Sequence, residues 1–344
     1  MSPWISLLLV LALTLVLLCA AAILGMARSL LVPPRMTDGR AVLLLKRLSP
    51  GDLELGFSDM TFDIRDESNG RPLRIAAWWI PARHPVDRTV VIVHGYSDAK
   101  VGGIAWAPMF HALGWNILAI DLRAHGESGG AYSTAGYWER HDLSQVLDRL
   151  KTDRPRETQT VVLFGVSLGA AVVTAAVESR RDIAAVMLEG PYTSYPEAVS
   201  AHADLLGAPG GWLRRVTIRT AQWLSNSDFG AVRPVDLIPS IPCPVMIVHA
   251  RDDFSVTPAT AEALRGALAR HGDRRDVFWE VADAGHVLCL GCDPAMYQAK
   301  VGRFLDSVLR EAITPEPEDG GTFAQADRPA VSTDSPGLSY RAVD

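Results

Sequence analysis

The chain has 344 residues, of which 48% are hydrophobic and 21% are charged. That length is enough for one large domain with a sizeable core, or for two smaller domains. With 28 Gly, 22 Pro and only 4 Cys, the composition excludes collagen-like, disulfide-rich and wholly disordered classes. The 33 basic and 39 acidic side chains give a net charge of −6, which argues against a nucleic-acid partner.

The N-terminal segment is long, apolar and almost free of ionisable side chains. Residues 4–27 are dense in Leu, Val, Ile and Ala, and they exceed the roughly 20 residues with which a helix crosses a bilayer. A cleaved secretory signal is the alternative, because three alanines at 20–22 offer a cleavage site, but no Lys or Arg precedes the stretch. A lipoprotein signal at Cys19 is disfavoured by the bulky Leu18 before it. We therefore predict an uncleaved transmembrane anchor over residues 1–28.

The basic residues around this anchor all follow it, and only the α-amine precedes it: Arg28, Arg35, Arg40, Lys46 and Arg47. An excess of Lys and Arg marks the cytoplasmic side of a membrane span. We therefore expect a single-pass membrane protein whose remaining chain lies in the cytoplasm.

An antiparallel hairpin is predicted after the anchor. Two runs of alternating polarity, Met60–Ile64 and Leu73–Ile80, flank a turn signal at 68–70. After Pro81 come short continuous apolar runs, which are typical of strands buried on both faces of a sheet.

Strands and helices alternate through this middle part of the chain. We predict strands at Thr89–Val93, Asn116–Ile120, Thr160–Phe164, Ala184–Leu188, Val245–Val248 and Val277–Val281. Helical patterns fill the gaps, at Ala105–Leu113, Trp138–Leu150, Leu168–Ser179, Thr257–Arg270 and Met296–Arg310. The alternation predicts an α/β fold over residues 40–312, with a mostly parallel sheet and helices on both faces. Functional residues should gather at the carboxyl ends of its strands.

Two segments stand outside this alternation. The interval 192–233 is too long for an ordinary connection, and Trp212 and Trp223 among scattered apolar residues indicate one or two short helices. We predict a lid above a binding site, with a merely structural insertion as the alternative. Residues 313–344 are rich in Pro, Gly, Ser, Thr and Asp, which predicts a disordered acidic tail.

A serine motif lies at one predicted strand-to-helix junction. Gly165-Val166-Ser167-Leu168-Gly169 directly follows a predicted strand and precedes a helical pattern. This is the context of the G-x-S-x-G nucleophile elbow, in which a strained turn lifts the serine Oγ out of the sheet. Glycines fit where backbone and helix crowd together, and the helix N-terminus presents unpaired N–H groups to negative charge. We interpret Ser167 as a nucleophile.

A serine hydroxyl needs a base, and the base needs an orienting carboxylate. His286 follows the last predicted strand, and the small residues before it let the loop bring its imidazole over the serine. The loop after the preceding strand carries two adjacent carboxylates, Asp252 and Asp253, and these residues alone leave both as candidates.

With these residues in place, the chain resembles the α/β-hydrolase superfamily from about Thr89 to Leu309. The order Ser, Asp, His is that of this superfamily. His94-Gly95 and the stretch 121–128 follow successive strands, as they do in this fold.

The family's acid loop decides between the two carboxylates. It often runs Gly-x-x-Asp-x-x-Val-x-Pro, and here Ala250 replaces the Gly while Asp253, Val256 and Pro258 match. The resemblance therefore implies Asp253 as the triad carboxylate, with Asp252 as a solvated or structural neighbour.

The oxyanion hole is also implied by the resemblance. Its donors are the backbone N–H groups of Leu168, after the nucleophile, and of Tyr96, after His94-Gly95. Each such donor contributes about 3 kcal/mol to the stability of a tetrahedral oxyanion. His94 resembles the histidine that braces this loop, and the phenol of Tyr96 is available to line a substrate pocket.

Several charged residues receive structural interpretations. Asp121, Arg123, His125 and Glu127 lie in a loop that is usually structural in this fold, and we expect a hydrogen-bonded scaffold. Glu139 and Asp142 share one face near a predicted helix start, where carboxylates interact favourably with the helix dipole. Cys289 and Cys292 form one CxxC without a second pair, so we expect packed or free thiols and no zinc site.

The resemblance implies a serine hydrolase that transfers an acyl group to water and needs no metal or organic cofactor. Ser167 disfavours the dehalogenases and epoxide hydrolases of the superfamily, which carry Asp at the elbow. The anchor, hairpin and lid resemble membrane-associated bacterial esterases of the Bem46-like type, and prolyl-oligopeptidase-like catalytic domains without a propeller. We expect a carboxylic ester substrate, a small molecule or a lipid at the membrane. A serine peptidase or thioesterase is the alternative, as is a non-catalytic binding protein, and no protein partner is identified.

Overall fold

The computed structural model describes residues 3–205, 210–253 and 258–313. All but the first residue of the tail predicted at 313–344 lies outside the described residues, as does Val256 of the acid-loop motif.

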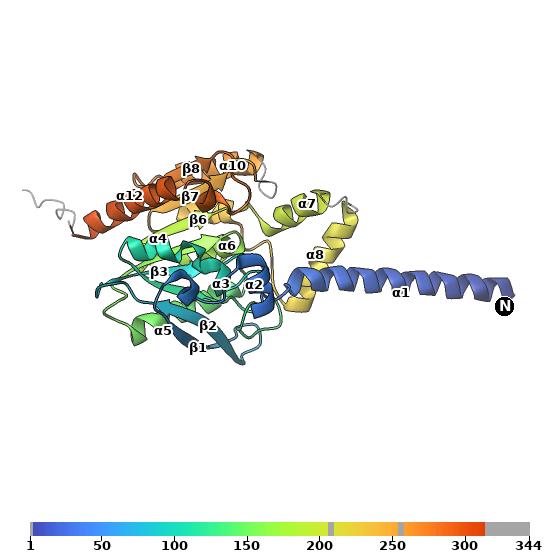
Figure 1. Cartoon of the computed structure of the whole chain (residues 1–344). Helices are drawn as coiled ribbons and strands as arrows, with labels where there is room; N and C mark the ends of the chain where they lie inside the picture. Colours follow the sequence, from blue (N-terminus) through green and yellow to red (C-terminus); the bar gives the residue numbers. More distant parts are fainter. Residues whose placement is uncertain (1–2, 206–209, 254–257, 314–344) are drawn as a thin grey trace, which may run out of the picture.

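An eight-stranded sheet forms the centre of the molecule, in the order β1-β2-β4-β3-β5-β6-β7-β8 (Figure 1). The β1–β2 and β2–β4 pairs are antiparallel, and the remaining neighbours are parallel. The strands are β1 Ser58–Arg65, β2 Pro72–Ile80, β3 Arg88–Val93, β4 Asn116–Ile120, β5 Thr160–Val166, β6 Ala185–Glu189, β7 Val245–Ala250 and β8 Val277–Val281. The predicted hairpin and the predicted α/β class are confirmed.

Helices cover both faces of this sheet. One face is packed against α5 Glu139–Asp153, α6 Leu168–Val177 and α10 Pro258–His271. The other face carries α2 Asp38–Leu45, α3 Lys100–Gly103, α4 Ala107–Ala112 and α12 Pro294–Ile313. Four short helical turns lie between these elements: Pro50–Leu53, Ile104–Trp106, Ile238–Ser240 and α11 Cys289–Cys292.

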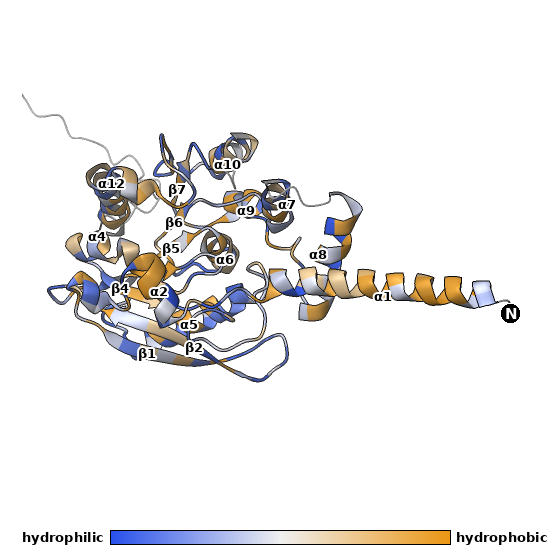
Figure 2. Ribbon diagram, turned by 45° about the vertical axis from the view of Figure 1, so that its right-hand side comes forward, coloured by the Kyte–Doolittle hydropathy of each residue, from blue (hydrophilic) through white to orange (hydrophobic). Residues whose placement is uncertain are grey.

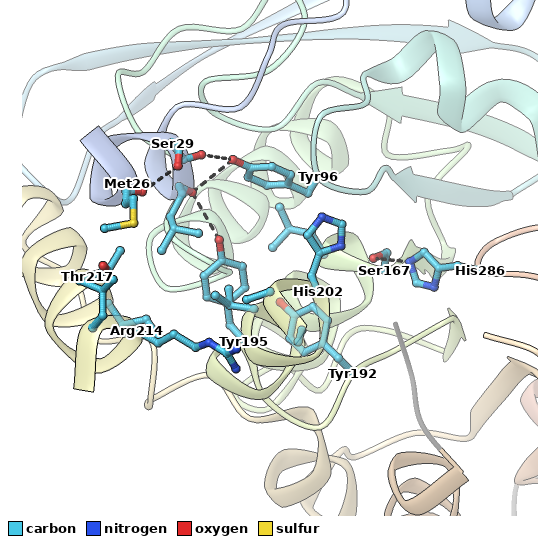
Figure 3. Close-up of a pocket in the computed structure, with 17 residues that line it drawn as sticks. Met26, Ser29, Tyr96, Ser167, Tyr192, Tyr195, His202, Arg214, Thr217 and His286 are labelled. Carbon is cyan, nitrogen blue, oxygen red and sulfur yellow. Dashed lines mark hydrogen bonds between the residues drawn. The ribbon is translucent and has the colours of Figure 1, made fainter. Parts of the chain in front are cut away.

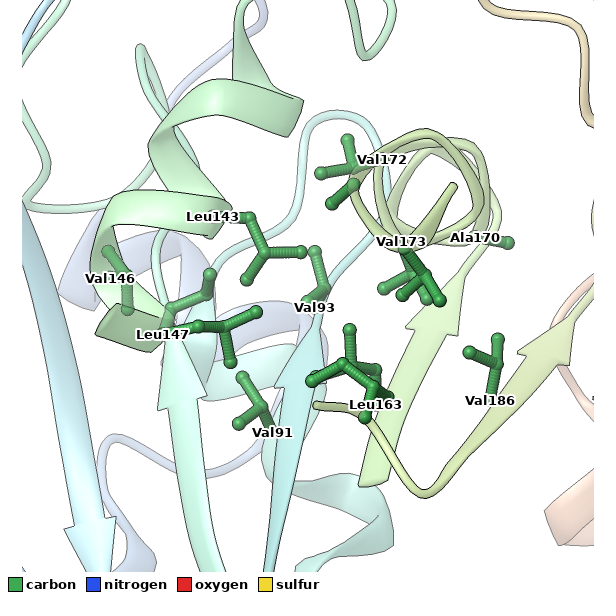
Figure 4. Close-up of a cluster of buried hydrophobic side chains, with 14 of the residues drawn as sticks. Val91, Val93, Leu143, Val146, Leu147, Leu163, Ala170, Val172, Val173 and Val186 are labelled. Atoms are coloured by element: carbon green, nitrogen blue, oxygen red, sulfur yellow. The ribbon is translucent and has the colours of Figure 1, made fainter. Parts of the chain in front are cut away.

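The central strands show why their sequences are continuously apolar. On β3, Val91 and Val93 belong to the cluster under α5 and α6, whereas Val90 and Ile92 belong to the cluster on the opposite face. Successive side chains of a strand point to opposite faces, so a strand with helices on both sides needs apolar residues throughout. Figure 4 shows the first cluster, with Leu143 and Leu147 of α5 lying close to the β3 side chains.

The N-terminal stretch forms one continuous helix, α1 Pro3–Leu31, which is longer than the predicted span. It is the one helix of the described residues that is long and apolar enough to cross a membrane. Most of it projects away from the rest of the molecule and is apolar on every side (Figures 1 and 2). Its carboxyl end is different, because Ala27 and Leu31 are fully buried against other parts of the chain.

The interval predicted as a lid contains α7 Tyr195–Leu205 and α8 Trp212–Ser225, followed by α9 Pro234–Leu237. α8 crosses the carboxyl end of α1 (Figures 1 and 2). There Ala221 joins Ala27, Leu31 and Phe229 in a small hydrophobic cluster that is separate from the two large ones.

Candidate active site

The serine motif forms the turn between β5 and α6. Ser167 has φ +52°, in the left-handed region that is costly for a residue with a side chain. A Cβ on Gly169 would lie 2.0 Å from the carbonyl oxygen of Val93, and one on Gly165 would lie 2.5 Å from the carbonyl oxygen of Gly169. The two glycines are therefore required by the close approach of strand and helix.

Three residues from separate loops meet above the carboxyl end of the sheet. His286, from the loop after β8, has its Nε2 3.0 Å from the Oγ of Ser167 (Figure 3). Its Nδ1 lies 2.6 Å from Oδ2 of Asp253, which follows β7 and has a fully buried side chain. A neutral histidine that donates from Nδ1 to this carboxylate accepts at Nε2 from the serine hydroxyl.

The structure distinguishes the two candidate carboxylates. Asp253 bonds to His286, whereas Asp252 is exposed and donates its backbone N–H to the carbonyl of Ala284 at 3.2 Å. Asp252 thus joins its loop to the histidine loop. Gly190, at φ +59°, was not singled out from the sequence, yet a Cβ there would lie 3.2 Å from Cε1 of His286. A glycine two positions after the predicted strand Ala184–Leu188 was the signal available.

Tyr96 and Leu168 line the same cavity as Ser167 and His286. Leu168 is the first residue of α6, where backbone N–H groups have no partner within the helix. Tyr96 follows Gly95, at which a Cβ would lie 3.4 Å from the Cβ of Ser167, so the two loops nearly touch.

His94 fixes the orientation of the peptide that joins Gly95 to Tyr96. The N–H of Leu122 donates to Nε2 of His94 at 3.0 Å, so Nδ1 carries the proton and donates to the carbonyl of Gly95 at 2.7 Å. Burial holds the pKa of His94 well below its usual value, so the ring stays neutral. In a planar trans peptide the N–H points opposite to the carbonyl, so the N–H of Tyr96 is directed away from His94.

The loop after β4 forms the predicted scaffold. Asp121 accepts from the backbone N–H of Lys100 at 2.6 Å and from its Nζ at 2.8 Å, and also from the N–H of Glu127 at 2.9 Å. The ring of His125 packs edge-on against His94 with the centroids 5.0 Å apart. Through His94, this network supports the loop that carries Tyr96.

Glu139 and Asp142 have more specific partners than the helix dipole alone. Glu139 is fully buried and accepts hydrogen bonds from the backbone N–H groups of Thr134 and Gly136. Asp142 binds Arg123 through two hydrogen bonds of 2.6 and 2.7 Å. The partners of Glu139 lie five and three positions before it, whereas the Asp142–Arg123 contact joins residues 19 positions apart and had no sign in the sequence spacing.

Glu189, at the end of β6, is a further residue that the sequence did not single out. Its backbone carbonyl accepts the N–H of Ser167 at 2.9 Å. Its buried carboxyl accepts from Trp106 Nε1 at 3.1 Å and from the hydroxyl of Tyr297. Burial raises the pKa of this carboxyl to about 7. Glu189 therefore holds the turn that carries Ser167 in place.

A cavity of about 580 Å³ opens beside Ser167 and His286 (Figure 3). Tyr96, Leu168 and Tyr192 line it near the serine, and α7 and α8 line it farther out. The end of α1 contributes the remaining wall, through Met26, Ser29 and Leu30. The sequence predicted a lid here but gave no indication that the N-terminal helix takes part.

Two phenols join α1 to the loops of the site. Tyr96 donates its hydroxyl to the carbonyl of Ser29 at 2.8 Å, and Tyr195 of α7 donates to the carbonyl of Leu30 at 3.3 Å. The last carbonyls of a helix lack partners within it, so these hydroxyls satisfy them. Tyr96, whose loop lies next to Ser167, therefore also holds the N-terminal helix.

The remaining predicted residues lie outside this constellation. Cys289 and Cys292 are free thiols, the first buried and the second exposed. Over residues 3–205, 210–253 and 258–313, no group of three or more His, Cys, Asp or Glu is placed to hold a metal ion.

Comparisons with known proteins agree with this geometry. A family model described as serine aminopeptidase, S33, matches residues 84–232. The uncharacterized protein YqkD of Bacillus subtilis is 25% identical over 246 residues, which cover 66% of this chain and 74% of that protein. The lysophosphatidylserine lipase ABHD12 of Rattus norvegicus is 25% identical over 189 residues, which cover 51% of this chain and 43% of the lipase. The structure of the esterase Pf2001 of Pyrococcus furiosus has a TM-score of 0.64 at 24% identity, covers 80% of this chain and 98% of its own, and shows the shared fold.

Proposed function

We propose that the chain, which has the α/β-hydrolase fold and resembles hydrolases of that superfamily, is a serine hydrolase that cleaves carboxylic esters. One observation carries the proposal: Ser167, His286 and Asp253 form a continuous hydrogen-bonded chain that opens into a cavity. That arrangement is the one required for an activated serine nucleophile.

The proposed reaction proceeds through an acyl-enzyme. Ser167 Oγ forms a bond to the acyl carbon while its proton passes to Nε2 of His286. The carbon–oxygen bond to the leaving alcohol then breaks, and His286 returns the proton to that alcohol. Water repeats both steps and releases the acid. Asp253 keeps the imidazole in the correct tautomer and stabilises its charged form.

The proposed oxyanion hole consists of the N–H groups of Leu168 and Tyr96. The first lies at the N-terminus of α6, where the helix dipole favours negative charge. The second belongs to the peptide that His94 orients through the carbonyl of Gly95. Because both donors are fixed before substrate binds, they stabilise the tetrahedral intermediate without reorganisation.

A lipid-derived ester is the substrate class that the cavity favours. Its wall is formed largely by Leu, Ile, Val, Met, Ala and Tyr side chains. The residues that line it among those described include no Asp or Glu, whereas an aminopeptidase needs an anionic group for the free amine of its substrate. This observation favours an ester over the aminopeptidase function that the family description names. Serine peptidase or thioesterase activity is the second candidate.

We also propose that α1 is retained as a membrane anchor. The exposed part of the helix is apolar on all sides, and its carboxyl end is buried in the folded domain. The basic residues that follow it favour a cytoplasmic domain. An N-terminal sequence of the protein from membranes that starts at residues 20–23 would contradict an uncleaved anchor, and protease accessibility in right-side-out vesicles tests the orientation.

The test of the enzymatic proposal is labelling of the purified protein with a fluorophosphonate, beside Ser167→Ala. We expect a stable adduct on Ser167, located by mass spectrometry, and none on the variant. Hydrolysis rates for an ester and an amide with the same acyl group then separate esterase from peptidase. A folded wild-type protein that forms no adduct and cleaves neither substrate would support a binding protein instead.

A further inference from the structure

We propose that α8 rests on the surface of an anionic phospholipid bilayer, so that the cavity receives its lipid substrate directly from the adjoining leaflet. The contact face consists of Trp212, Arg215, Val216, Arg219 and Trp223, and we call it the α8 outer face. The inference rests on the proposed function and on the proposed anchor, and it adds a second membrane contact and a route of entry.

The spacing of these residues puts them on one side of the helix. Steps of three and four residues keep side chains on one helical face. All five are exposed, and the two tryptophans are 70% and 77% exposed. The opposite face is buried, through Thr217, Ala221 and Ser225. α8 is thus amphipathic in an unusual sense, because its exposed side carries two of the largest apolar side chains of the protein.

The composition of α8 fits one kind of partner. Tryptophan is enriched where a bilayer meets water, and arginine keeps its guanidinium at the headgroups while its stem covers apolar surface. α8 carries three Arg and no Asp or Glu. A helix of this kind is attracted to anionic lipid.

The length of α1 sets the level of α8 relative to the membrane. Residues 4–18 of α1 are exposed throughout, and burial becomes complete only at Ala27 and Leu31. At about 1.5 Å per residue, the 20 or so residues before Ala27 span roughly the 30 Å of a hydrocarbon core. No spacer remains between the bilayer and the folded domain, so whatever packs on Ala27 and Leu31 lies at the headgroups.

α8 is the helix that packs there. Its Ala221 contacts the cluster of Ala27 and Leu31, and α8 lies across α1 where the exposed length of α1 begins (Figures 1 and 2). The outer face of α8 points away from this cluster, and we infer that it lies among the lipid headgroups because α8 crosses α1 at their level.

The same two helices form the outer wall of the cavity. Leu213, Thr217 and Ile218 of α8 line it together with Met26 and Leu30 of α1. The wall that separates the cavity from the bilayer is therefore made by elements that touch the bilayer. A single-chain lipid ester has only to slide between α1 and α8 to place its carbonyl near Ser167.

The experiment compares two substrates on the full-length protein in vesicles of phosphatidylcholine with phosphatidylglycerol. One is a water-soluble ester, p-nitrophenyl butyrate, and the other is a long-chain monoacyl lipid ester held in the vesicle. For Trp212→Ala/Trp223→Ala we expect the lipid rate to fall about tenfold and the butyrate rate to stay within about twofold. For Arg215→Gln/Arg219→Gln we expect a loss of about fivefold per arginine with the lipid, and only in anionic vesicles.

The matched control is Met296→Ala/Arg303→Gln on α12, far from α1, which should change neither rate (Figure 1). Equal losses on both substrates, or unchanged lipid rates in both pairs of variants, overturn the inference. A wild-type protein that cleaves neither substrate shows instead that the proposed function has failed.

A second readout needs no activity. Lipids brominated near the headgroup quench tryptophans at the interface, so wild-type protein should lose more fluorescence than Trp212→Phe/Trp223→Phe. Equal quenching in the two proteins means that the outer face is away from lipid. That result, together with cross-linking of α8 between two chains, would assign the face to a second copy and overturn the inference.

Discussion

The two walls of the cavity are built on different principles. The strand-end wall, with Ser167, His286 and the loop of Tyr96, is held by close backbone contacts and buried hydrogen bonds. The helical wall, made by α7, α8 and the end of α1, is held by a small apolar cluster and two phenol hydroxyls. The first wall tolerates little change because its atoms must be fixed for chemistry. The second determines which molecule reaches the serine, and side-chain changes there should alter selectivity without abolishing the reaction.

The largest effect on the strand-end wall is expected from Asp253→Asn. The amide would favour the wrong tautomer of His286, and such a change lowers kcat by about 10⁴-fold in a comparable triad. Asp252→Asn is the matched control, because it changes the neighbouring carboxylate and leaves the contact with His286 in place. We expect it to retain activity within about threefold of wild type, because among the described residues Asp252 is hydrogen-bonded through its backbone N–H. Steady-state kinetics on a soluble ester measure kcat for both variants. Equal losses of kcat in the two variants would show that the wrong carboxylate has been assigned.

Gly169→Ala should show how tightly the same wall is packed. Alanine usually stabilises a helix relative to glycine by about 1 kcal/mol. Here its Cβ would lie 2.0 Å from the carbonyl oxygen of Val93, so β3 or α6 must move. We expect a loss of about 3 kcal/mol in the free energy of unfolding, measured in urea. Gly266→Ala in α10 is the control, since the nearest described atom outside the helix backbone is the flexible tip of Arg270 at 3.7 Å, and it should be neutral or stabilising.

The strand-end wall was largely predictable from the sequence, because its determinants are local. The motif at 165–169, the loop of His286 and each apolar strand span only a few consecutive residues of the sequence. All eight strands were predicted. The local sequence pattern alone could not decide which of Asp252 and Asp253 is the triad carboxylate. They required the family's acid loop, and the structure shows that one of them points its carboxylate to His286.

The helical wall was predictable only in part, because it depends on contacts between distant segments. A lid was expected at 192–233, but the packing of Ala221 on Ala27 joins segments almost two hundred positions apart. An apolar stretch such as residues 4–27 has the same composition whether its end is free or docked. The sequence therefore contained no sign that Met26 lines the cavity.

Glu189 gives the strand-end wall a dependence on pH. Burial raises the pKa of its carboxyl from the ordinary value of 4.5 to about 7, so the folded state binds this proton more tightly than the unfolded state. Its contribution to stability is complete below pH 4.5 and is lost as the pH rises through 7. The loss amounts to about 3 kcal/mol.

Glu189→Gln has no charge to bury, so its free energy of unfolding should fall less than that of wild type between pH 5 and pH 8. Urea unfolding at the two pH values measures the difference. Glu178→Gln, at an exposed position after α6, is the control and should follow wild type. Parallel pH profiles for wild type and Glu189→Gln would mean that this carboxyl is already ionised at pH 5.

Tyr96 belongs to both walls, and Tyr96→Phe tests whether they are coupled. Burial raises the pKa of its hydroxyl to about 12, so it remains a donor to the carbonyl of Ser29. Loss of this bond frees the loop that carries the proposed oxyanion donor. We expect kcat for a soluble ester to fall about fivefold with little change in KM, as for one hydrogen bond of about 1 kcal/mol.

Tyr195→Phe is the matched variant on the helical side. It removes the donor to the carbonyl of Leu30 but touches no proposed catalytic group. We expect it to raise KM for a long-chain ester and to leave kcat for the soluble ester unchanged. If both variants lower kcat alike, the helical wall contributes to catalysis and the division between the two walls is wrong.

Met26→Trp should give the most selective effect. Met26 lines the cavity from the last turns of α1, so a larger side chain shortens the space available to an acyl chain without reaching Ser167. Loss of one or two methylene sites in an apolar pocket changes kcat/KM by about tenfold. We therefore expect about a tenfold lower kcat/KM for a long-chain ester and an unchanged value for butyrate. Leu17→Trp lies on the exposed part of the same helix and controls for effects on membrane insertion. A loss of kcat/KM in both variants would mean that α1 acts only as an anchor. A loss confined to Met26→Trp would mean that α1 also limits the length of the acyl chain that the cavity accepts.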